Sequence, residues 1–212
     1  MAVFRSFCAE EEAAAAIFQA LKRLRYPGAE KLTHRDHVQR VAVMPSLWMA
    51  NKAFTIVYEM GFQPAVTIGE EEGGKRITLS VQIPGSPHRV YPMPPLHCSL
   101  SEGDVPYRFE QEFDALRSIR NIKTTKESVC EGIAKRNGLL YAGGSGYPVV
   151  DTDVEPIIRS QLETVTPLLT IYRLIDMYPQ HQLFVQQCLD VFISLMPNIP
   201  QEAASAEGSA TS

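Results

Sequence analysis

The sequence has 212 residues, of which 45% are hydrophobic and 21% are charged, so it is long enough to bury a core without disulfides or metals. Its formal net charge of −4 argues against broad electrostatic capture of nucleic acid, because no excess of Lys and Arg is present to release counterions. No apolar run approaches about 20 residues and the N-terminus lacks a secretion signal, so we expect no membrane span and a cytoplasmic location.

The four cysteines are far apart in the sequence and form no CxxC pair. This spacing favours buried or incidental thiols in a reducing compartment over a disulfide framework. The cysteines are Cys8, Cys98, Cys130 and Cys188.

Apolar residues recur every three or four positions in two early segments and predict helices over residues 9–25 and 46–60. In the first helix, Glu10 to Glu12 would lie in the first turn, where the helix dipole favours acidic side chains. In the second, Ser46 is the expected N-cap. Apolar residues cover most of its circumference, so this helix is either buried or part of an interface. We favour burial against the hairpin that follows.

The segment between these helices, residues 29–45, is consistent with either a short helix or a short strand. It contains the densest polar cluster of the chain, with His34, Asp36 and His37 close together. Histidine and aspartate are suitable zinc ligands, but their spacing matches no known motif. We therefore interpret the cluster as a solvated loop and assign no metal site.

Residues 63–83 alternate between apolar and polar side chains, which predicts a β-hairpin with one apolar face. The four apolar residues of its second strand are Ile77, Leu79, Val81 and Ile83. The turn is expected over Gly69 to Gly74, which is rich in glycine and glutamate. Because a two-stranded hairpin is not stable alone, helices must cover the apolar face.

A third antiparallel strand is predicted over His88 to Tyr91, ended by the proline-rich segment Pro92 to Pro95. An apolar stripe then predicts a long helix over residues 104–136, with Pro106 tolerated in its first turn. A glycine-rich loop over residues 138–153 follows it and resembles no phosphate-binding fingerprint.

The C-terminal part is predicted to contain helices over residues 156–166, 168–177 and 180–196, with Pro167 separating the first two. A small, polar tail over residues 201–212 is expected to be flexible.

These elements define an α+β fold: a small antiparallel sheet, made of a hairpin and a third strand, is covered by helices and followed by a helical C-terminal portion. We divide the chain into an α+β core over residues 1–137, the glycine-rich loop over 138–153, a helical portion over 154–200 and the polar tail over 201–212.

No combination of residues predicts catalysis. His97 and Cys98 are adjacent, but neighbouring side chains of an extended chain point apart, and no GxSxG motif is present. We therefore assign no catalytic residue, metal or cofactor, and lean towards a protein that is not an enzyme.

Two groups of residues are candidates for binding. Lys75, Arg76 and Arg89 could form an anion-binding face on the small sheet, or simply keep that face soluble. For protein recognition, the candidates combine the apolar helix with the proline-flanked segment, whose alternative interpretation is a plain connector. These candidates are Trp48, Tyr91, Met93 and Leu96.

The C-terminal half carries three motifs that resemble the "LESVT…TIKKL…WPE" ending of a phage family. They are Leu162 to Thr166, Thr170 to Leu174 and Tyr178 to Gln180. The family is catalogued as nucleotide-modification-associated, fifth class, with unknown activity. Here Pro167 to Leu169 intervene and Tyr178 replaces the family's tryptophan. The resemblance covers part of the chain and implies a virus-encoded accessory protein that acts around nucleic-acid modification or host takeover.

The leading functional hypothesis is therefore a phage accessory protein that binds a host or viral protein without catalysing a reaction. One alternative is a nucleotide or nucleic-acid modification enzyme, or its accessory factor, that uses residues 33–37 and the glycine-rich loop. Another is a virion or assembly subunit. All three hypotheses are compatible with a homo-oligomer.

Overall fold

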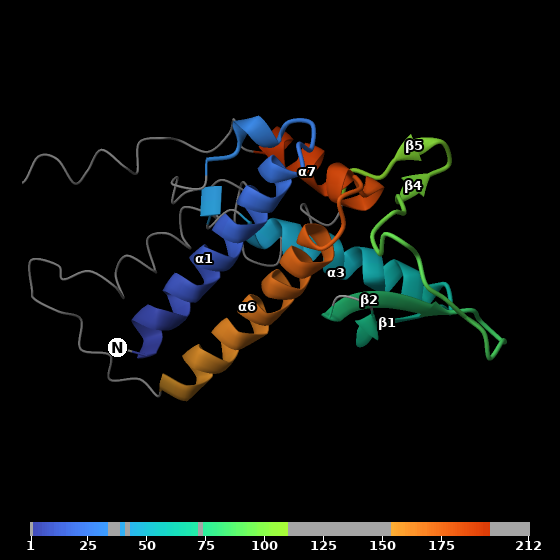
Figure 1. Ribbon diagram of the computed structural model, residues 1–212, viewed down its shortest axis with the longest axis horizontal. Helices are drawn as coiled ribbons and strands as arrows, with labels where there is room; N and C mark the ends of the chain where they lie inside the picture. Colours follow the sequence, from blue (N-terminus) through green and yellow to red (C-terminus); the bar gives the residue numbers. More distant parts are fainter. Residues whose placement is uncertain (1, 34–38, 41–42, 72–73, 110–153, 196–212) are drawn as a thin grey trace, which may run out of the picture.

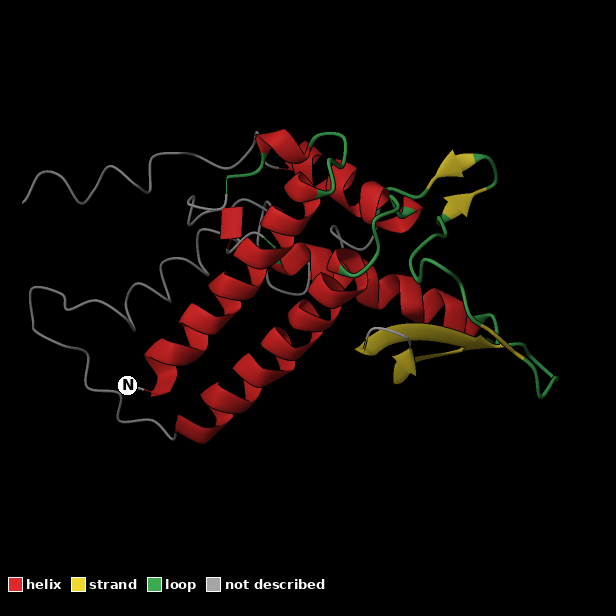
Figure 2. Ribbon diagram, in the orientation of Figure 1, coloured by secondary structure: helices red, strands yellow, loops and turns green. Residues whose placement is uncertain are grey.

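The computed structural model describes residues 2–33, 39–40, 43–71, 74–109 and 154–195. Its helices, in chain order, are α1 (Ala2–Arg23), the 3-10 helix η1 (Ala29–Lys31), α3 (Met44–Glu59), α6 (Val154–Asp176) and α7 (Leu183–Leu195). Its strands are β1 (Gln63–Glu71), β2 (Gly74–Gln82), β3 (Arg89–Val90), β4 (Ser101–Glu102) and β5 (Val105–Pro106). The fold is α+β, as predicted, with a small antiparallel sheet at one end of a helical body (Figure 1; Figure 2).

Helices α1 and α6 lie side by side and run in the same direction, with the N-terminal ends of both at lower left in Figure 1. At their C-terminal ends, Arg23 Nη2 donates to the Asp176 carboxylate at 2.6 Å and to the Asp176 backbone carbonyl at 3.1 Å. The apolar faces of both helices are buried between them, including Phe18 and Leu168. This pair is the main support of the helical body.

The first helix begins earlier than the predicted start at Ala9, because the small and apolar residues before it continue the helical pattern. Glu10 to Glu12 therefore lie in mid-helix, and the dipole interaction predicted for them is wrong. Glu11 is instead buried, with its Oε2 atom 3.1 Å from Nη2 of Arg40.

Pro167 does not separate two helices, because α6 continues through it as one element. Proline lacks the N–H of the helical ladder and normally kinks or ends a helix. Here Pro167 is exposed while the next residue, Leu168, is buried against α1. Packing between α1 and α6 outweighs the lost hydrogen bond, so the predicted break is wrong.

Helix α3 begins at Met44, and Pro45 occupies its first turn. Ser46 is therefore inside the helix, and its predicted role as N-cap is wrong, since a proline with its fixed φ already suits this position. The helix contacts both β1 and α7, and Met49 and Ala53 are buried. The predicted burial is correct for this face only, because Tyr58 near the helix end is exposed.

The predicted hairpin is confirmed: β1 and β2 pair in antiparallel register, and β3 adds to the other side of β2. The strands extend further towards the turn than predicted, since Glu71 pairs with Gly74 and Gly69 lies within β1. The third strand is shorter than predicted and consists of Arg89 and Val90.

The helices cover the apolar face of the hairpin unevenly. Leu79 in β2 is buried in the core. Opposite it in β1, Val66 is 46% exposed, and its neighbour on the same face, Ile68, is 72% exposed. The helices therefore bury Leu79 in β2 but leave Val66 and Ile68 in the middle of β1 exposed, although α3 contacts β1.

Residues 101–106 form a second small hairpin, β4 and β5, where the start of a long helix was predicted. Gly103 takes a positive φ of 59° at its turn, a conformation that ends a helix and suits glycine. The predicted helix start at Asp104 is therefore wrong. Residues 110–136 of that helix, the glycine-rich loop, the tail and the cluster of His34, Asp36 and His37 lie outside the described residues.

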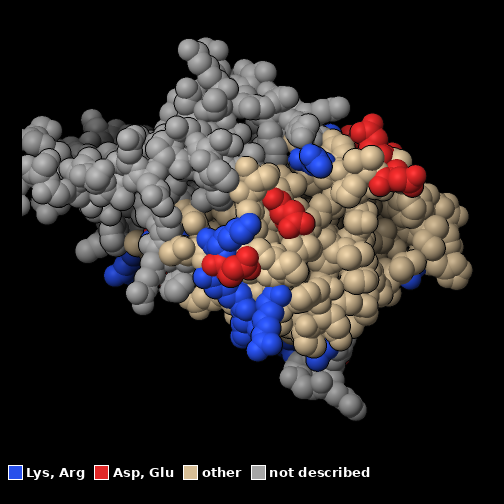
Figure 3. Space-filling view, turned by 90° about the horizontal axis from the view of Figure 1, so that it is seen from above, with Lys and Arg blue, Asp and Glu red and all other residues tan. Residues whose placement is uncertain are grey.

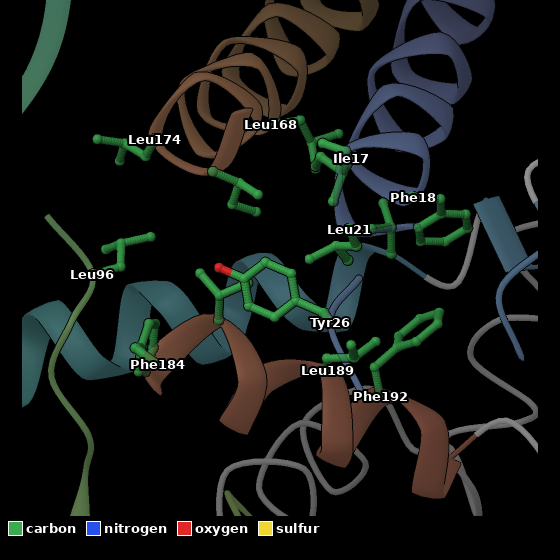
Figure 4. Packing of buried hydrophobic residues seen from close by; sticks show 14 of the residues in the cluster. Ile17, Phe18, Leu21, Tyr26, Leu96, Leu168, Leu174, Phe184, Leu189 and Phe192 are labelled. Carbon is green, nitrogen blue, oxygen red and sulfur yellow. The ribbon is translucent and has the colours of Figure 1, made fainter. Parts of the chain in front are cut away.

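One hydrophobic cluster joins the N-terminal and C-terminal helices (Figure 4). In it the rings of Phe18 from α1 and Phe192 from α7 lie with their centroids 5.8 Å apart. Helix α7 begins at Leu183, later than the predicted start at Gln180. The residue before it, Gln182, is fully buried and has a separate role described below.

Candidate protein-binding surface

The segment from Ile83 to Met93, here called the arm, leaves β2, turns back through β3 and projects from the end of the sheet (Figure 1). It carries four large apolar side chains that are 37–57% exposed: Ile83, Val90, Tyr91 and Met93. Single exposed apolar residues are normal on a protein surface, but a group of them in one short segment is typical of an interaction site.

The turn of the arm is held by hydrogen bonds. The backbone N–H of Ile83 donates to the His88 carbonyl at 3.1 Å, and the N–H of Ser86 donates to the Ile83 carbonyl at 3.1 Å. Gln82 Nε2 donates to the Ser86 carbonyl at 3.3 Å, and the His88 N–H donates to Ser86 Oγ at 3.2 Å. A turn ordered in this way presents its apolar side chains without a large entropic cost on binding.

Arg89, within the arm, forms side-chain hydrogen bonds across the sheet that hold the arm in place. Its guanidinium donates to Ser80 Oγ at 2.9 and 3.1 Å and to Gln82 Oε1 at 3.4 Å. Its Nη2 also approaches the Gln63 carbonyl of β1 at 3.5 Å. Arg89 thus connects all three strands of the sheet, and Ser80 beneath it is buried.

The chain that follows the arm is anchored to the helical body by Gln182. Its Oε1 atom accepts the Leu96 N–H at 2.7 Å, and its Nε2 atom donates to the Leu174 carbonyl at 2.7 Å. The Phe184 N–H donates in turn to the Leu96 carbonyl at 3.2 Å. One buried amide therefore joins the end of α6, the start of α7 and the segment after the arm.

A second polar contact lies beside this amide. The Tyr26 hydroxyl accepts the Gln182 N–H at 2.9 Å, and burial raises the pKa of that hydroxyl. The His181 ring stacks on Tyr26 at 4.5 Å, with its Nε2 2.7 Å from the Leu24 carbonyl. His97 Nδ1 lies 3.2 Å from the His181 carbonyl. These groups bond mainly to backbone atoms, an arrangement that holds segments together.

Gln187 of α7 holds the second hairpin in a similar way. Its Oε1 accepts the Leu100 N–H at 3.1 Å, and its Nε2 donates to the carbonyls of Leu100 and Tyr107 at 2.8 Å. The side-chain amide thus pairs with the backbone as a neighbouring strand would. The chain on both sides of the second hairpin is therefore fixed to α7.

The structure separates the four residues that the sequence predicted for protein recognition. Tyr91 and Met93 are exposed together in the arm. Leu96 is buried in the core, so its predicted exposure is wrong: its backbone is bonded to Gln182 and its side chain packs in the helical body. Trp48 belongs to α3, and its side chain lies outside the described residues. Sequence reasoning missed Ile83, which alternation assigned to a covered face, and gave Val90 of the predicted third strand no binding role.

The candidate anion-binding residues do not form one group. Arg76 pairs with Gly69 near the turn of the hairpin, whereas Arg89 pairs with Gln82 at the other end of β2. Six residues of strand separate these levels by about 20 Å. Strand alternation also places Lys75 on the face opposite to that of Arg76. The three cations are therefore too dispersed to share one phosphate.

The thiols near the arm are poor nucleophiles. Burial raises the pKa of Cys98, and burial together with the nearby Cys98 raises the pKa of Cys188 to about 12. Because both pKa values lie above neutral pH, the two thiols stay mainly protonated there. The thiolate is the reactive form, so both groups react slowly. The adjacent His97 is oriented towards a backbone carbonyl.

An apolar cavity of about 80 Å³ lies inside the helical body, between α1, α3, α6 and α7. Its lining is almost entirely aliphatic and aromatic and includes Leu21 from α1, Leu174 from α6 and Phe184 from α7, which are labelled in Figure 4. A cavity of this kind stays dry and offers no polar group to orient a reacting substrate.

Within the residues that the structure describes, no group of three or more His, Cys, Asp or Glu could hold a metal ion. In the same part of the chain, none of the helices has the length and apolar character to span a bilayer. On the face shown in Figure 3, charged side chains gather in small groups with broad uncharged areas between them.

No protein-family model matches the sequence, and searches of curated proteins and solved structures gave no match either. The resemblance to the phage nucleotide-modification-associated family therefore stays a prediction from the motifs of the sequence.

Proposed function

We propose that this protein is a binding protein without catalytic activity, a phage accessory factor that acts in the host cytoplasm. In this proposal, it engages a host or viral protein through the arm. The observation that carries the proposal is the group of exposed apolar side chains, Ile83, Val90, Tyr91 and Met93, on a hydrogen-bonded turn.

The arm is suited to this role for three physical reasons. Aromatic and methionine side chains are enriched in the centres of protein interfaces. Tyr91 supplies a large amphipathic surface, and Met93 adapts its flexible side chain to a partner. The hydrogen bonds of the turn and those of the Arg89 side chain reduce the entropy that binding would otherwise lose.

Affinity capture tests the proposal. The tagged full chain is incubated with lysate of the bacterial host, and bound proteins are compared with those bound by a Tyr91→Asp/Met93→Asp double variant. The matched control is Val105→Asp, which places the same charge on an exposed apolar residue of the second hairpin, itself 61% exposed. We expect a specific partner to bind the parent chain and the control but not the double variant.

Equal capture by all three proteins would contradict the proposal, as would the absence of any partner that distinguishes the parent chain from bare resin. Circular dichroism and thermal unfolding of each variant show that a loss of capture is not a loss of folding. The substituted side chains are exposed, so the fold should tolerate them.

A further inference from the structure

The edge of the sheet opposite to the arm is the longest exposed strand edge of the described residues. In the strand order β1-β2-β3, β1 has β2 on one side and no described strand on the other. Alternate residues of this nine-residue strand present their backbone N–H and C=O groups to that free side, because the residues between them bond β2. Charged side chains and proline often protect such an edge, and β1 has Pro64 near one end and Glu70 near the other, but Val66 and Ile68 are exposed at its centre.

The sequence of β1 is complementary to itself in one antiparallel register. When two copies pair around Thr67, each Val66 lies opposite Ile68 of the second copy, and each Ala65 lies opposite Gly69. The exposed apolar side chains of both copies then lie together on one face, because directly opposite residues share a face.

The other face of the same register brings threonines together. Within one chain, the hydroxyl oxygens of Thr67 and Thr78 are 2.9 Å apart across β1 and β2. In the paired register Thr67 lies opposite Thr67 of the second copy, so this contact continues across the new junction. Cross-strand threonine pairs of this kind favour sheet formation.

Charge also selects the antiparallel arrangement. A parallel, in-register pairing would place each Glu70 beside Glu70 of the second copy, and like charges directly opposite destabilise a sheet. The antiparallel register instead places Glu70 opposite Pro64 of the second copy.

An open groove lies beside the same edge, between the end of α3 and the start of β1. It is lined by Phe54, Thr55, Tyr58, Gln63 and Pro64. In the antiparallel register Glu70 of the second copy is level with Pro64, so the groove adds contact area beyond the strands themselves.

We propose that two copies of this chain associate through antiparallel pairing of β1 with β1, centred on Thr67, to form one continuous six-stranded sheet. Such an interface is isologous and closes on itself, so it yields a dimer with no free β1 edge. The arm lies on the opposite edge of each sheet and stays accessible in the dimer, so this inference does not depend on the proposed function.

Sedimentation of the full chain over a dilution series tests the association. We expect a dimer that dissociates on dilution, and a shift to monomer in Ile68→Lys. The control Val105→Lys introduces the same charge at an exposed apolar residue away from the edge and should remain dimeric. A parent chain that is monomeric at every concentration, or a dimer equally stable in Ile68→Lys, would overturn the proposal.

Disulfide formation tests the register without relying on that variant. In the proposed dimer Thr67→Cys brings two thiols to directly opposite positions, within the Cα separation of up to about 7 Å that a disulfide spans. Glu70→Cys is the control, because its two copies lie six residues apart along the strands, or about 20 Å. Rapid oxidation of Thr67→Cys to a covalent dimer, above the background of the parent chain, supports the register. Oxidation of Glu70→Cys at the same rate would overturn it.

Discussion

Replacing Gln182 by leucine tests how the arm and both C-terminal helices are held together. The side chain of Gln182 is fully buried, and its amide bonds the Leu96 N–H and the Leu174 carbonyl, each at 2.7 Å. Leucine has a similar volume but neither donates nor accepts a hydrogen bond. Both backbone groups would then stay buried without this partner, since Leu96 and Leu174 are themselves buried.

The expected loss of unfolding free energy follows from the Leu96 N–H and the Leu174 carbonyl, which both lose their partner. A buried donor or acceptor left without a partner costs about 1–3 kcal/mol, so Gln182→Leu should lower the free energy of unfolding by about 2–6 kcal/mol. A protein of ordinary stability has about 5–15 kcal/mol in total, so this single change should remove a large fraction of it.

Urea unfolding measures this loss. With a denaturant slope of about 2 kcal/mol per molar, the midpoint should fall by about 1–3 M at unchanged slope. Gln180→Leu is the matched control, because Gln180 is exposed two positions earlier in the chain. If Gln182→Leu shifted the midpoint no more than Gln180→Leu, the anchoring role of this amide would be refuted.

Three further outcomes follow from burial and charge. Leu79→Ala should cost about 2–5 kcal/mol in unfolding free energy, because Leu79 is buried under the helices, whereas Val105→Ala should stay within about 0.5 kcal/mol. Equal losses in urea titrations would contradict the covered position of β2. Cys188, with its pKa raised to about 12, should resist alkylation at neutral pH until the protein unfolds, and rapid labelling of the native protein in mass spectrometry would contradict its burial. Arg23→Ala should lower the thermal stability by less than about 1 kcal/mol, because the Arg23 side chain is largely exposed although it pairs with Asp176; a larger loss would show that the contact does more than an ordinary surface ion pair.

Alternation along the chain was enough to predict the sheet. Ile77, Leu79 and Val81 occupy one face of a confirmed strand, and the third strand lies where His88 to Tyr91 predicted it. The pattern could not show which part of that face the helices reach. Val66 and Ile68 follow the same alternation but lie beyond the cover, because the cover depends on how α3 crosses the sheet.

Local sequence signals gave wrong predictions at positions where contacts between distant segments determine the structure. Pro167 predicts a helix break, but the packing of α1 against α6 keeps the helix continuous. Asp104 and Pro106 resemble the start of a helix, yet the glycine before them turns the chain into a hairpin. Nothing in the sequence distinguishes Gln182 from its exposed neighbour Gln180, because a buried bridging amide is defined only by segments distant in the chain.

The central claim is that the molecule acts by binding a protein partner through the arm, and hydrogen exchange tests it most directly. Backbone exchange of the full chain is measured alone and in complex with the partner obtained by affinity capture. The account predicts that exchange slows over residues 83–93, while the second hairpin over residues 101–106 is unchanged. Protection confined to other parts of the chain, with the exchange of residues 83–93 unaltered, would contradict it.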